Sequence, residues 1–150
     1  IKPTGRILKG NDCPNRIFIN VVDKYREKEP NNDFPYATEL TSGTKMGFKM
    51  NSTSDVDIFK FTLPASRFTI KVTSDNEYTN KMLRWELYDN QYQLCGSGTM
   101  SLSEGDDEFE ISKTVYSSVC YLKLYNNSYA QQYPSLIPDN ELVLEILPSN

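Results

Sequence analysis

The chain has 150 residues, which suffices for one domain that buries its own core without metal or disulfide staples. Its formal net charge is −4, and acidic and basic residues are interspersed, so no Lys/Arg stripe could follow a phosphate backbone and nucleic acid is not expected as a partner. Histidine is absent, which excludes Ser-His-Asp and Cys-His catalysis and the HExxH zinc helix. No apolar stretch is long enough to cross a membrane, so membrane insertion is not expected either.

The chain begins with Ile rather than Met, so we expect a mature chain or a domain of a larger protein. Residues 1–26 are predicted to be an N-terminal extension or linker, and residues 27–150 to form the domain. Near the junction, residues 16–28 fit a strand or a helix equally well, and Pro30 ends either element. Beyond it, residues 35–40 could form one helical turn.

Two polar segments combine carboxylate and amide oxygens without histidine or cysteine. The first is the run from Glu27 to Asp33, and the second is the Asp55-Val56-Asp57 sequence. Oxygen ligands of this kind are what a hard cation such as calcium prefers. Two alternatives remain at this point, namely a calcium site and a solvated acidic turn beside the start of a strand.

From Thr44 onward the chain consists of short segments in which apolar and polar residues alternate, separated by polar turns. Antiparallel sheets with one wet face produce this pattern, and no long helical segment intervenes. We therefore predict an all-β fold, an antiparallel, jelly-roll-like β-sandwich of about eight strands that follows the N-terminal extension. Trp85 alternates with Leu83 and Leu87 and is predicted to be a core residue. The alternating apolar positions are Phe59 and Phe61, Phe68, Ile70 and Val72, Leu83 to Leu87, Phe109 and Ile111, Leu122 and Leu124, and Leu142, Leu144 and Ile146.

Three further features are interpreted structurally. The Gly96-Ser97-Gly98 stretch lacks the Lys and helix of a phosphate loop and predicts a bend or bulge. Glu108 and Glu110 could be a glycosidase pair, but a solvated strand face explains them better. Residues 126–140 are rich in Tyr, Gln, Asn and Pro and predict an exposed loop.

The three cysteines are too far apart for a CxxC motif, and an odd number leaves at least one free thiol. A bridge between Cys95 and Cys120 is conceivable in a secreted protein. Cys120 shares strand parity with Leu122 and Leu124, whereas Cys95 is out of phase with Leu94. Buried or half-buried free thiols are therefore the expected state, and the sequence does not place Cys13.

A family resemblance rests on the order of several short motifs. Glu29-Pro30-Asn31-Asn32 is followed by Ala37, by Gly47 and by the run from Asp55 to Phe61. Later, residues 83–89, 120–125 and 142–147 match three strands of the same family. In this order the chain resembles the bacterial pre-peptidase C-terminal domain, which is related to the collagen-binding domains of clostridial collagenases. The match covers about residues 27–147.

The resemblance implies a non-catalytic accessory β-sandwich of a secreted or cell-surface bacterial protein, such as a protease or adhesin, that stabilises its parent or binds a protein substrate. It implies as partner an extracellular protein or peptide, or the parent protease domain. It also implies calcium as the ion. Two departures, Asn32 and Ser54, place neutral residues where those relatives often carry acidic ones, which lowers the charge facing the ion. The implied metal ligands are Glu27, Glu29, Asn31, Asn32, Asp55 and Asp57.

The collagen-binding relatives use tyrosines on one sheet face. The corresponding surface here is predicted to consist of Tyr121, Lys123, Tyr125, Tyr129 and Tyr133. The structural alternative is that tyrosines are simply good strand formers. As a second function, a carbohydrate-binding sandwich fits exposed aromatics and a structural calcium equally well.

Overall fold

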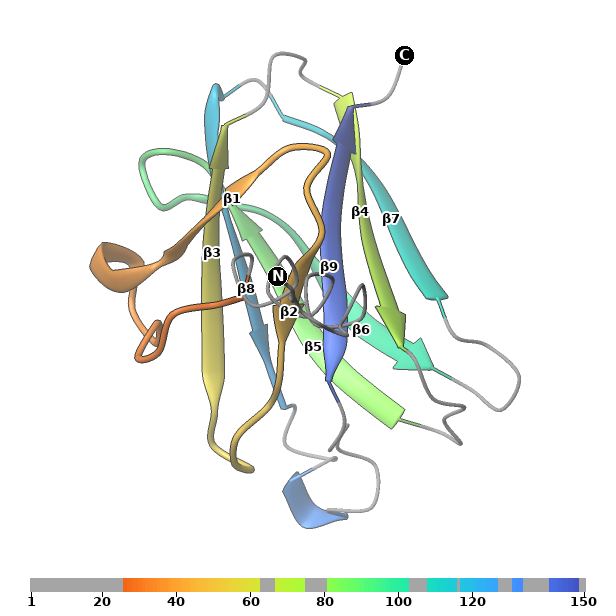
Figure 1. Cartoon of the computed structure of the whole chain (residues 1–150). Helices are drawn as coiled ribbons and strands as arrows, with labels where there is room; N and C mark the ends of the chain where they lie inside the picture. Colours follow the sequence, from red (N-terminus) through yellow and green to blue (C-terminus); the bar gives the residue numbers. More distant parts are fainter. Residues whose placement is uncertain are drawn as a thin grey trace, which may run out of the picture.

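The computed structural model describes residues 26–62, 67–74, 81–102, 108–115, 117–126, 131–133 and 141–148. In this part of the chain, two β-sheets pack face to face, as Figure 1 shows, so the predicted β-sandwich is confirmed. One sheet has the strand order β1-β3-β8-β5-β6, and the other has the order β2-β9-β4-β7. The elements are the 3-10 helix η1 (Phe34–Tyr36) and the strands β1 (Thr38–Thr41), β2 (Met46–Phe48), β3 (Val56–Thr62), β4 (Arg67–Ser74), β5 (Lys81–Tyr88), β6 (Leu94–Leu102), β7 (Glu108–Thr114), β8 (Val119–Tyr125) and β9 (Leu142–Pro148).

The strand pairing differs from the prediction at one edge. Each strand pair in the two sheets is antiparallel except β1 and β3, which run parallel with Thr38 opposite Phe59. The helical turn expected over residues 35–40 is shorter than predicted. It is the 3-10 helix η1, which ends at Tyr36, and β1 begins two residues later. The described residues hold nine strands, against the eight or so expected.

The core between the sheets follows the predicted alternation. In β9, Leu142, Leu144 and Ile146 are fully buried while the residues between them are half-buried. Aromatic rings join the two sheets edge to face, with centroids 5.6 Å apart for Phe48 and Phe59. Such pairs contribute about 0.5–1.5 kcal/mol beyond their buried area. The core is therefore continuous across both layers.

Trp85 lies in this core with 6% of its surface exposed, as predicted. Its ring packs directly over Gly98 of the neighbouring strand, where a Cβ atom would stand 2.9 Å from Trp85 Nε1. Gly98 is therefore required for the ring to fit. The bulge predicted nearby is present one residue earlier than expected: Leu87 pairs with Gly96 and Tyr88 with Leu94, which leaves Cys95 unpaired.

A second cluster of rings forms on the outer face of the five-stranded sheet. Phe34 stacks on Tyr92 at 4.5 Å between centroids and meets Tyr88 and Tyr121 edge-on at 5.1 and 5.3 Å. Tyr92 has a φ of 60°, a left-handed backbone that costs a non-glycine residue about 1–2 kcal/mol. Because η1 lies over this face, Tyr121 is buried at 7% exposure.

Cys95 and Cys120 are both free, which agrees with the favoured interpretation of the sequence. Cys120 is buried as expected, but Cys95, the unpaired residue at the bulge, is exposed. Cys13 lies outside the described residues.

Other sequence predictions fall only partly within the described chain. Glu108 and Glu110 lie in β7, opposite Thr73 and Lys71. The predicted extension is described only at Arg26, which pairs in parallel with Gly47.

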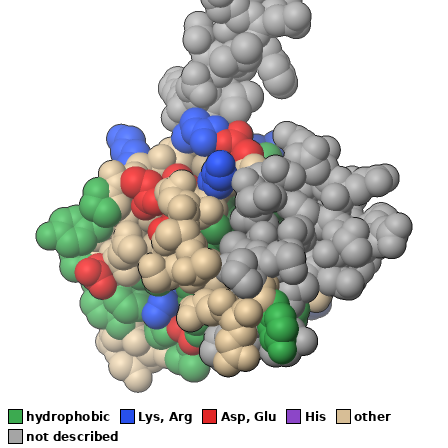
Figure 2. Space-filling model, turned by 90° about the horizontal axis from the view of Figure 1, so that it is seen from below, with side chains coloured by type: hydrophobic (Ala, Val, Ile, Leu, Met, Phe, Trp, Pro, Cys, Tyr) green, Lys and Arg blue, Asp and Glu red, His purple; other side chains and the backbone are tan. Residues whose placement is uncertain are grey.

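The surface and the helices add two observations. On the face in Figure 2, side chains of both charges are scattered among neutral ones. Within the described ranges, no helix is long and apolar enough to cross a bilayer.

Candidate metal centre

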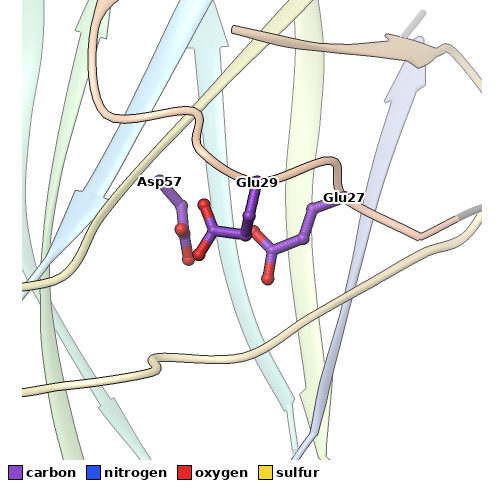
Figure 3. Close-up of side chains that lie close together, drawn as sticks. All are labelled: Glu27, Glu29 and Asp57. Carbon is purple, nitrogen blue, oxygen red and sulfur yellow. The ribbon is translucent and has the colours of Figure 1, made fainter. Parts of the chain in front are cut away.

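Three carboxylates meet at the open edge of the sandwich. Glu27 and Glu29 come from the segment before η1, and Asp57 comes from β3. One oxygen of each lies within 4.8 Å of the others, and Figure 3 shows the three side chains pointing toward one another. Asp57 has the strand parity of Phe59 and Phe61, so its carboxylate points inward, between the two sheets.

Backbone hydrogen bonds fix the segment that carries the two glutamates. Glu27 N–H donates to the carbonyl of Gly47 at 3.0 Å, which attaches the segment to β2. Ile58 N–H donates to the carbonyl of Asn31 at 2.9 Å, which attaches it to β3. Lys28 N–H donates to Thr38 Oγ1 at 3.0 Å. The segment therefore connects β2 of one sheet to β1 and β3 of the other, and it brings its two glutamates close to Asp57.

Asp57 is the residue at this site whose environment requires explanation. It is fully buried, and neither of its carboxylate oxygens has a hydrogen-bond partner in the described part of the structure. Burial raises its pKa well above the usual range, and the charges of Glu27 and Asp55 raise it further. A buried carboxylate in this state carries a free-energy cost unless a proton or a cation joins it.

Glu27 shares this environment. Burial raises its pKa, although the hydrogen bond from Lys49 N–H, 2.8 Å from Glu27 Oε1, acts in the opposite direction. Among the described ion pairs, none joins a lysine or arginine side chain to Glu27, Glu29 or Asp57. Within the described residues, the three carboxyl groups therefore lie together without a lysine or arginine partner.

Asn31 lies beside the carboxylates and contacts Glu27. It is fully buried, and its Nδ2 donates to Glu27 Oε2 at 3.2 Å and to Thr38 Oγ1 at 3.3 Å. Its Oδ1 has no partner among the described residues. Amide and carboxylate oxygens, with no nitrogen or sulfur ligand, are the donor set that calcium prefers. The residues present therefore fit the ion that the sequence resemblance implies.

The other two implied ligands have different surroundings. Asp55 is buried, but Oδ2 accepts from Asn51 N–H at 2.6 Å and Oδ1 accepts from Val56 N–H at 3.0 Å. Asn32 is exposed. The structure thus brings Glu27, Glu29 and Asp57 together with Asn31 beside them, and the roles of all six residues as ligands remain predictions.

Sequence reasoning missed one residue of the site. Asn51 Nδ2 donates to Glu29 Oε1 at 2.5 Å and so orients that exposed carboxylate. The sequence carries no signal for this contact, because it depends on how the loop before β3 returns to the N-terminal segment.

The predicted tyrosine surface is only partly present. The prediction that Tyr121 belongs to an exposed surface is wrong, because the rings of Phe34 and Tyr92 cover it. Lys123 and Tyr125 are half-buried, and Lys123 Nζ lies 5.1 Å from the centroid of the Tyr125 ring. Tyr133 is 51% exposed. Tyr129 lies outside the described residues.

Glu86 organises the exposed part of this face. Its Oε1 accepts from Tyr88 Oη at 2.5 Å and its Oε2 from Tyr125 Oη at 2.9 Å. Burial favours the protonated form of Glu86, but these hydrogen bonds and the charge of Lys123 outweigh it and lower the Glu86 pKa. The face is thus a polar network in which tyrosine hydroxyls already have partners.

Comparison with known proteins gives matches only at the level of structure. No protein-family model and no curated protein matches the chain. Among solved structures, the chain is similar to the pre-peptidase C-terminal domain of a collagenase from Bacillus anthracis, at 17% identity over 80% of this chain and 99% of that chain, with a TM-score of 0.49. That domain is of the family whose motifs the sequence resembles.

Two further solved structures are similar at lower scores. One is a structure described as CBM4, a carbohydrate-binding module, at 12% identity over 65% of this chain and 64% of that chain, with a TM-score of 0.42. The other is PliG of Aeromonas hydrophila, a periplasmic inhibitor of g-type lysozyme, at 12% identity over 73% of this chain and 96% of that chain, with a TM-score of 0.39. The function of this chain has to be inferred from its own residues.

Proposed function

We propose that the chain is a non-catalytic accessory domain of a secreted or cell-surface protein, and that a calcium ion joins its N-terminal segment to the sandwich. One observation carries the calcium part of this proposal. Asp57 is fully buried with two unpartnered carboxylate oxygens and faces two glutamates from a segment distant in sequence. A cation at this point would supply the missing partners and offset the repulsion among the three charges.

Glu27, Glu29, Asp57 and Asn31 Oδ1 would hold the ion, and water would complete its coordination. The ion acts here as a structural link and supplies no reaction step. Glu29 is exposed, so the site opens to solvent on one side. Sites of this kind in extracellular modules bind calcium with dissociation constants of about 10⁻⁴–10⁻³ M, which suits a secreted protein in a calcium-rich medium.

For the partner, we propose an extracellular protein or peptide, or the parent protein itself. The large exposed apolar side chains of the described residues support a binding role, because rigid aromatic rings make efficient contacts. Tyr36 is 67% exposed, Tyr92 48% and Tyr133 51%. A carbohydrate is the second candidate, since exposed rings also stack on sugars. Binding to a panel of extracellular matrix proteins and to a glycan array separates the two candidates.

The calcium proposal is tested by thermal unfolding in excess calcium and in chelator, with Asp57→Asn as the test variant. A ligand that binds only the folded state raises its stability by about 2.7 kcal/mol at one hundred times its dissociation constant. We expect a calcium-dependent rise in the unfolding midpoint that Asp57→Asn abolishes. Asp33→Asn is the matched control, because Asp33 is an exposed acidic residue of the same segment. Identical midpoints in calcium and chelator for the unsubstituted protein would disprove the site.

A further inference from the structure

The two sheets present four edge strands, and three of them are protected against pairing with another chain. β1 is four residues long and carries the exposed Glu39, whose carboxylate lies 3.9 Å from Lys60 Nζ. β2 is three residues long, and Arg26 and Glu27 cover its outer edge by pairing with Gly47. β7 carries two glutamates and a lysine in its sequence. Short length, cover and charge are the usual protections of a sheet edge.

The fourth edge strand, β6, has none of these protections over most of its length. It is nine residues long and ends the five-stranded sheet, and in the described structure no strand pairs with its outer side. The sequence from Gln91 to Ser103 contains no acidic residue, no lysine or arginine and no proline. The bulge at Cys95 disturbs only the beginning of the strand, so residues 96–102 form an uninterrupted ladder with β5. Leu94, at the start of β6, is 57% exposed.

We propose that β6 pairs with β6 of a second copy of this chain, antiparallel about a two-fold axis perpendicular to the sheet. The two five-stranded sheets would then form one continuous sheet across the dimer. Such an axis keeps the inner and outer faces of the two sheets aligned, so residues of equal parity stand opposite each other. The contact satisfies the backbone groups that the outer edge of β6 presents.

The side chains of β6 are suited to pairing with the β6 strand of a second copy. The outward residues of its middle section are Ser97, Thr99 and Ser101, and all three are exposed. In the two-fold arrangement hydroxyl side chains stand opposite hydroxyl side chains, a pairing that favours cross-strand hydrogen bonds. Although the chain has a net charge of −4, no charged residue of one β6 strand would face its counterpart. The inward residues Gly96 and Gly98 leave room on the core side.

The test introduces a charge at the centre of this strand. Thr99→Glu places a carboxylate opposite Arg84 of β5 within the monomer, so the fold tolerates it, but brings two like charges together across the dimer axis. Thr41→Glu is the control, because it makes the same substitution at an exposed threonine of β1, on the opposite edge of the same sheet. Circular dichroism and thermal unfolding verify that both variants fold.

Sedimentation equilibrium over a range of concentrations should show a reversible dimer of the unsubstituted chain. We expect Thr99→Glu to raise its dissociation constant by about tenfold or more and Thr41→Glu to leave it unchanged. Amide hydrogen exchange should show protection of the alternate N–H groups of residues 96–102 that point to the free edge; this protection should increase with protein concentration and be lost in Thr99→Glu.

Three results would overturn the proposal: a monomer at every concentration, a dimer indifferent to Thr99→Glu, or a dimer weakened equally by Thr41→Glu. The dimer is expected in both calcium and chelator. Its presence or absence is therefore independent of whether Asp57 belongs to a metal site.

Discussion

Asp55 and Asp57 are separated by one residue and are both buried, yet their carboxylates are in opposite situations. Each oxygen of Asp55 accepts a backbone N–H, from Asn51 and from Val56. Neither oxygen of Asp57 has a partner in the described part of the chain, and two glutamates approach it. Charge-assisted hydrogen bonds to backbone N–H groups stabilise an ionised carboxylate, whereas burial beside like charges destabilises it.

The difference shows how one loop can combine two roles. Asp55 fixes the turn that leads into β3, and both of its carboxylate oxygens accept hydrogen bonds from the chain itself. Asp57 lies two residues further on, and its carboxylate points into the space between the sheets, where only a proton or a cation can neutralise it. The first aspartate belongs to the fold, and the second is the centre of the proposed calcium site.

Substituting each aspartate by asparagine should change stability in opposite directions in the presence of chelator. Asp55→Asn leaves one backbone N–H facing an amide NH₂ and should lower the unfolding free energy by about 2 kcal/mol. Asp57→Asn removes the cost of protonating a buried carboxyl that would ionise in the unfolded chain, and it adds a donor that Glu27 or Glu29 can accept from, so it should raise the unfolding free energy by about 2 kcal/mol. Denaturant unfolding in chelator measures both values. Equal losses in the two variants would show that Asp57 has an internal partner after all.

The pH dependence of stability reports on Asp57. Since the pKa of Asp57 is raised from 3.8 in the folded chain, the folded state binds its proton more tightly than the unfolded state does. In chelator, this contribution to stability is fully present below about pH 4 and is lost as the pH rises toward the folded pKa of about 10, by at most about 1.4 kcal/mol per pH unit.

Subtracting the Asp57→Asn curve from that of the unsubstituted protein isolates this contribution, because the other titrating groups are shared. Parallel curves between pH 4 and pH 9 would contradict the raised pKa. Calcium should reverse the trend, since the ion competes with the proton and binds more tightly as the pH rises.

The sandwich could be predicted from the sequence because its signal is local. Alternation in Leu142, Leu144 and Ile146 identifies a strand with one buried face whatever its neighbours are, and the structure confirms that face. Which strands pair is a non-local property. The parallel pairing of β1 with β3 could not be predicted, because a four-residue strand after a polar segment carries too little pattern to reveal its direction.

The alternation rule failed where a second layer covers the outer face. Ile58 and Tyr121 have the parity of exposed residues, yet they are 2% and 7% exposed. The ring of Phe34 covers Tyr121, and the N-terminal segment bonds to the backbone of Ile58. Periodicity predicts on which face of the sheet a side chain lies, but it does not predict whether that face is exposed to solvent.

The sequence could predict which oxygen-bearing residues form the candidate site, but it could not predict how their side chains are arranged. Glu27, Glu29 and Asp57 converge as the resemblance implied. The sequence could not separate Asp55 from Asp57, because the distinction depends on the backbone N–H groups of Asn51 and Val56 rather than on residue type.

The smallest expected effect separates cation binding from packing within one segment. Phe34→Ala removes the ring that contacts Tyr88, Tyr92 and Tyr121 and should lower the unfolding free energy by about 1 kcal/mol, less than for a core phenylalanine because Phe34 is half-exposed. The calcium-dependent rise in midpoint should persist, since no carboxylate is touched. Tyr36→Ala, at a 67% exposed position of the same 3-10 helix, should change neither value.

A spectroscopic signature accompanies this loss. Burial raises the pKa of Tyr121, and Tyr92 raises it further, so uncovering the ring in Phe34→Ala should move the ultraviolet titration of that phenol toward its ordinary range. If Phe34→Ala instead abolished the calcium response while Tyr36→Ala did not, the ring cluster and the carboxylate cluster would be one cooperative unit. The segment from Glu27 to Tyr36 would then detach from the sandwich as a whole, and calcium would control whether Tyr121 is accessible.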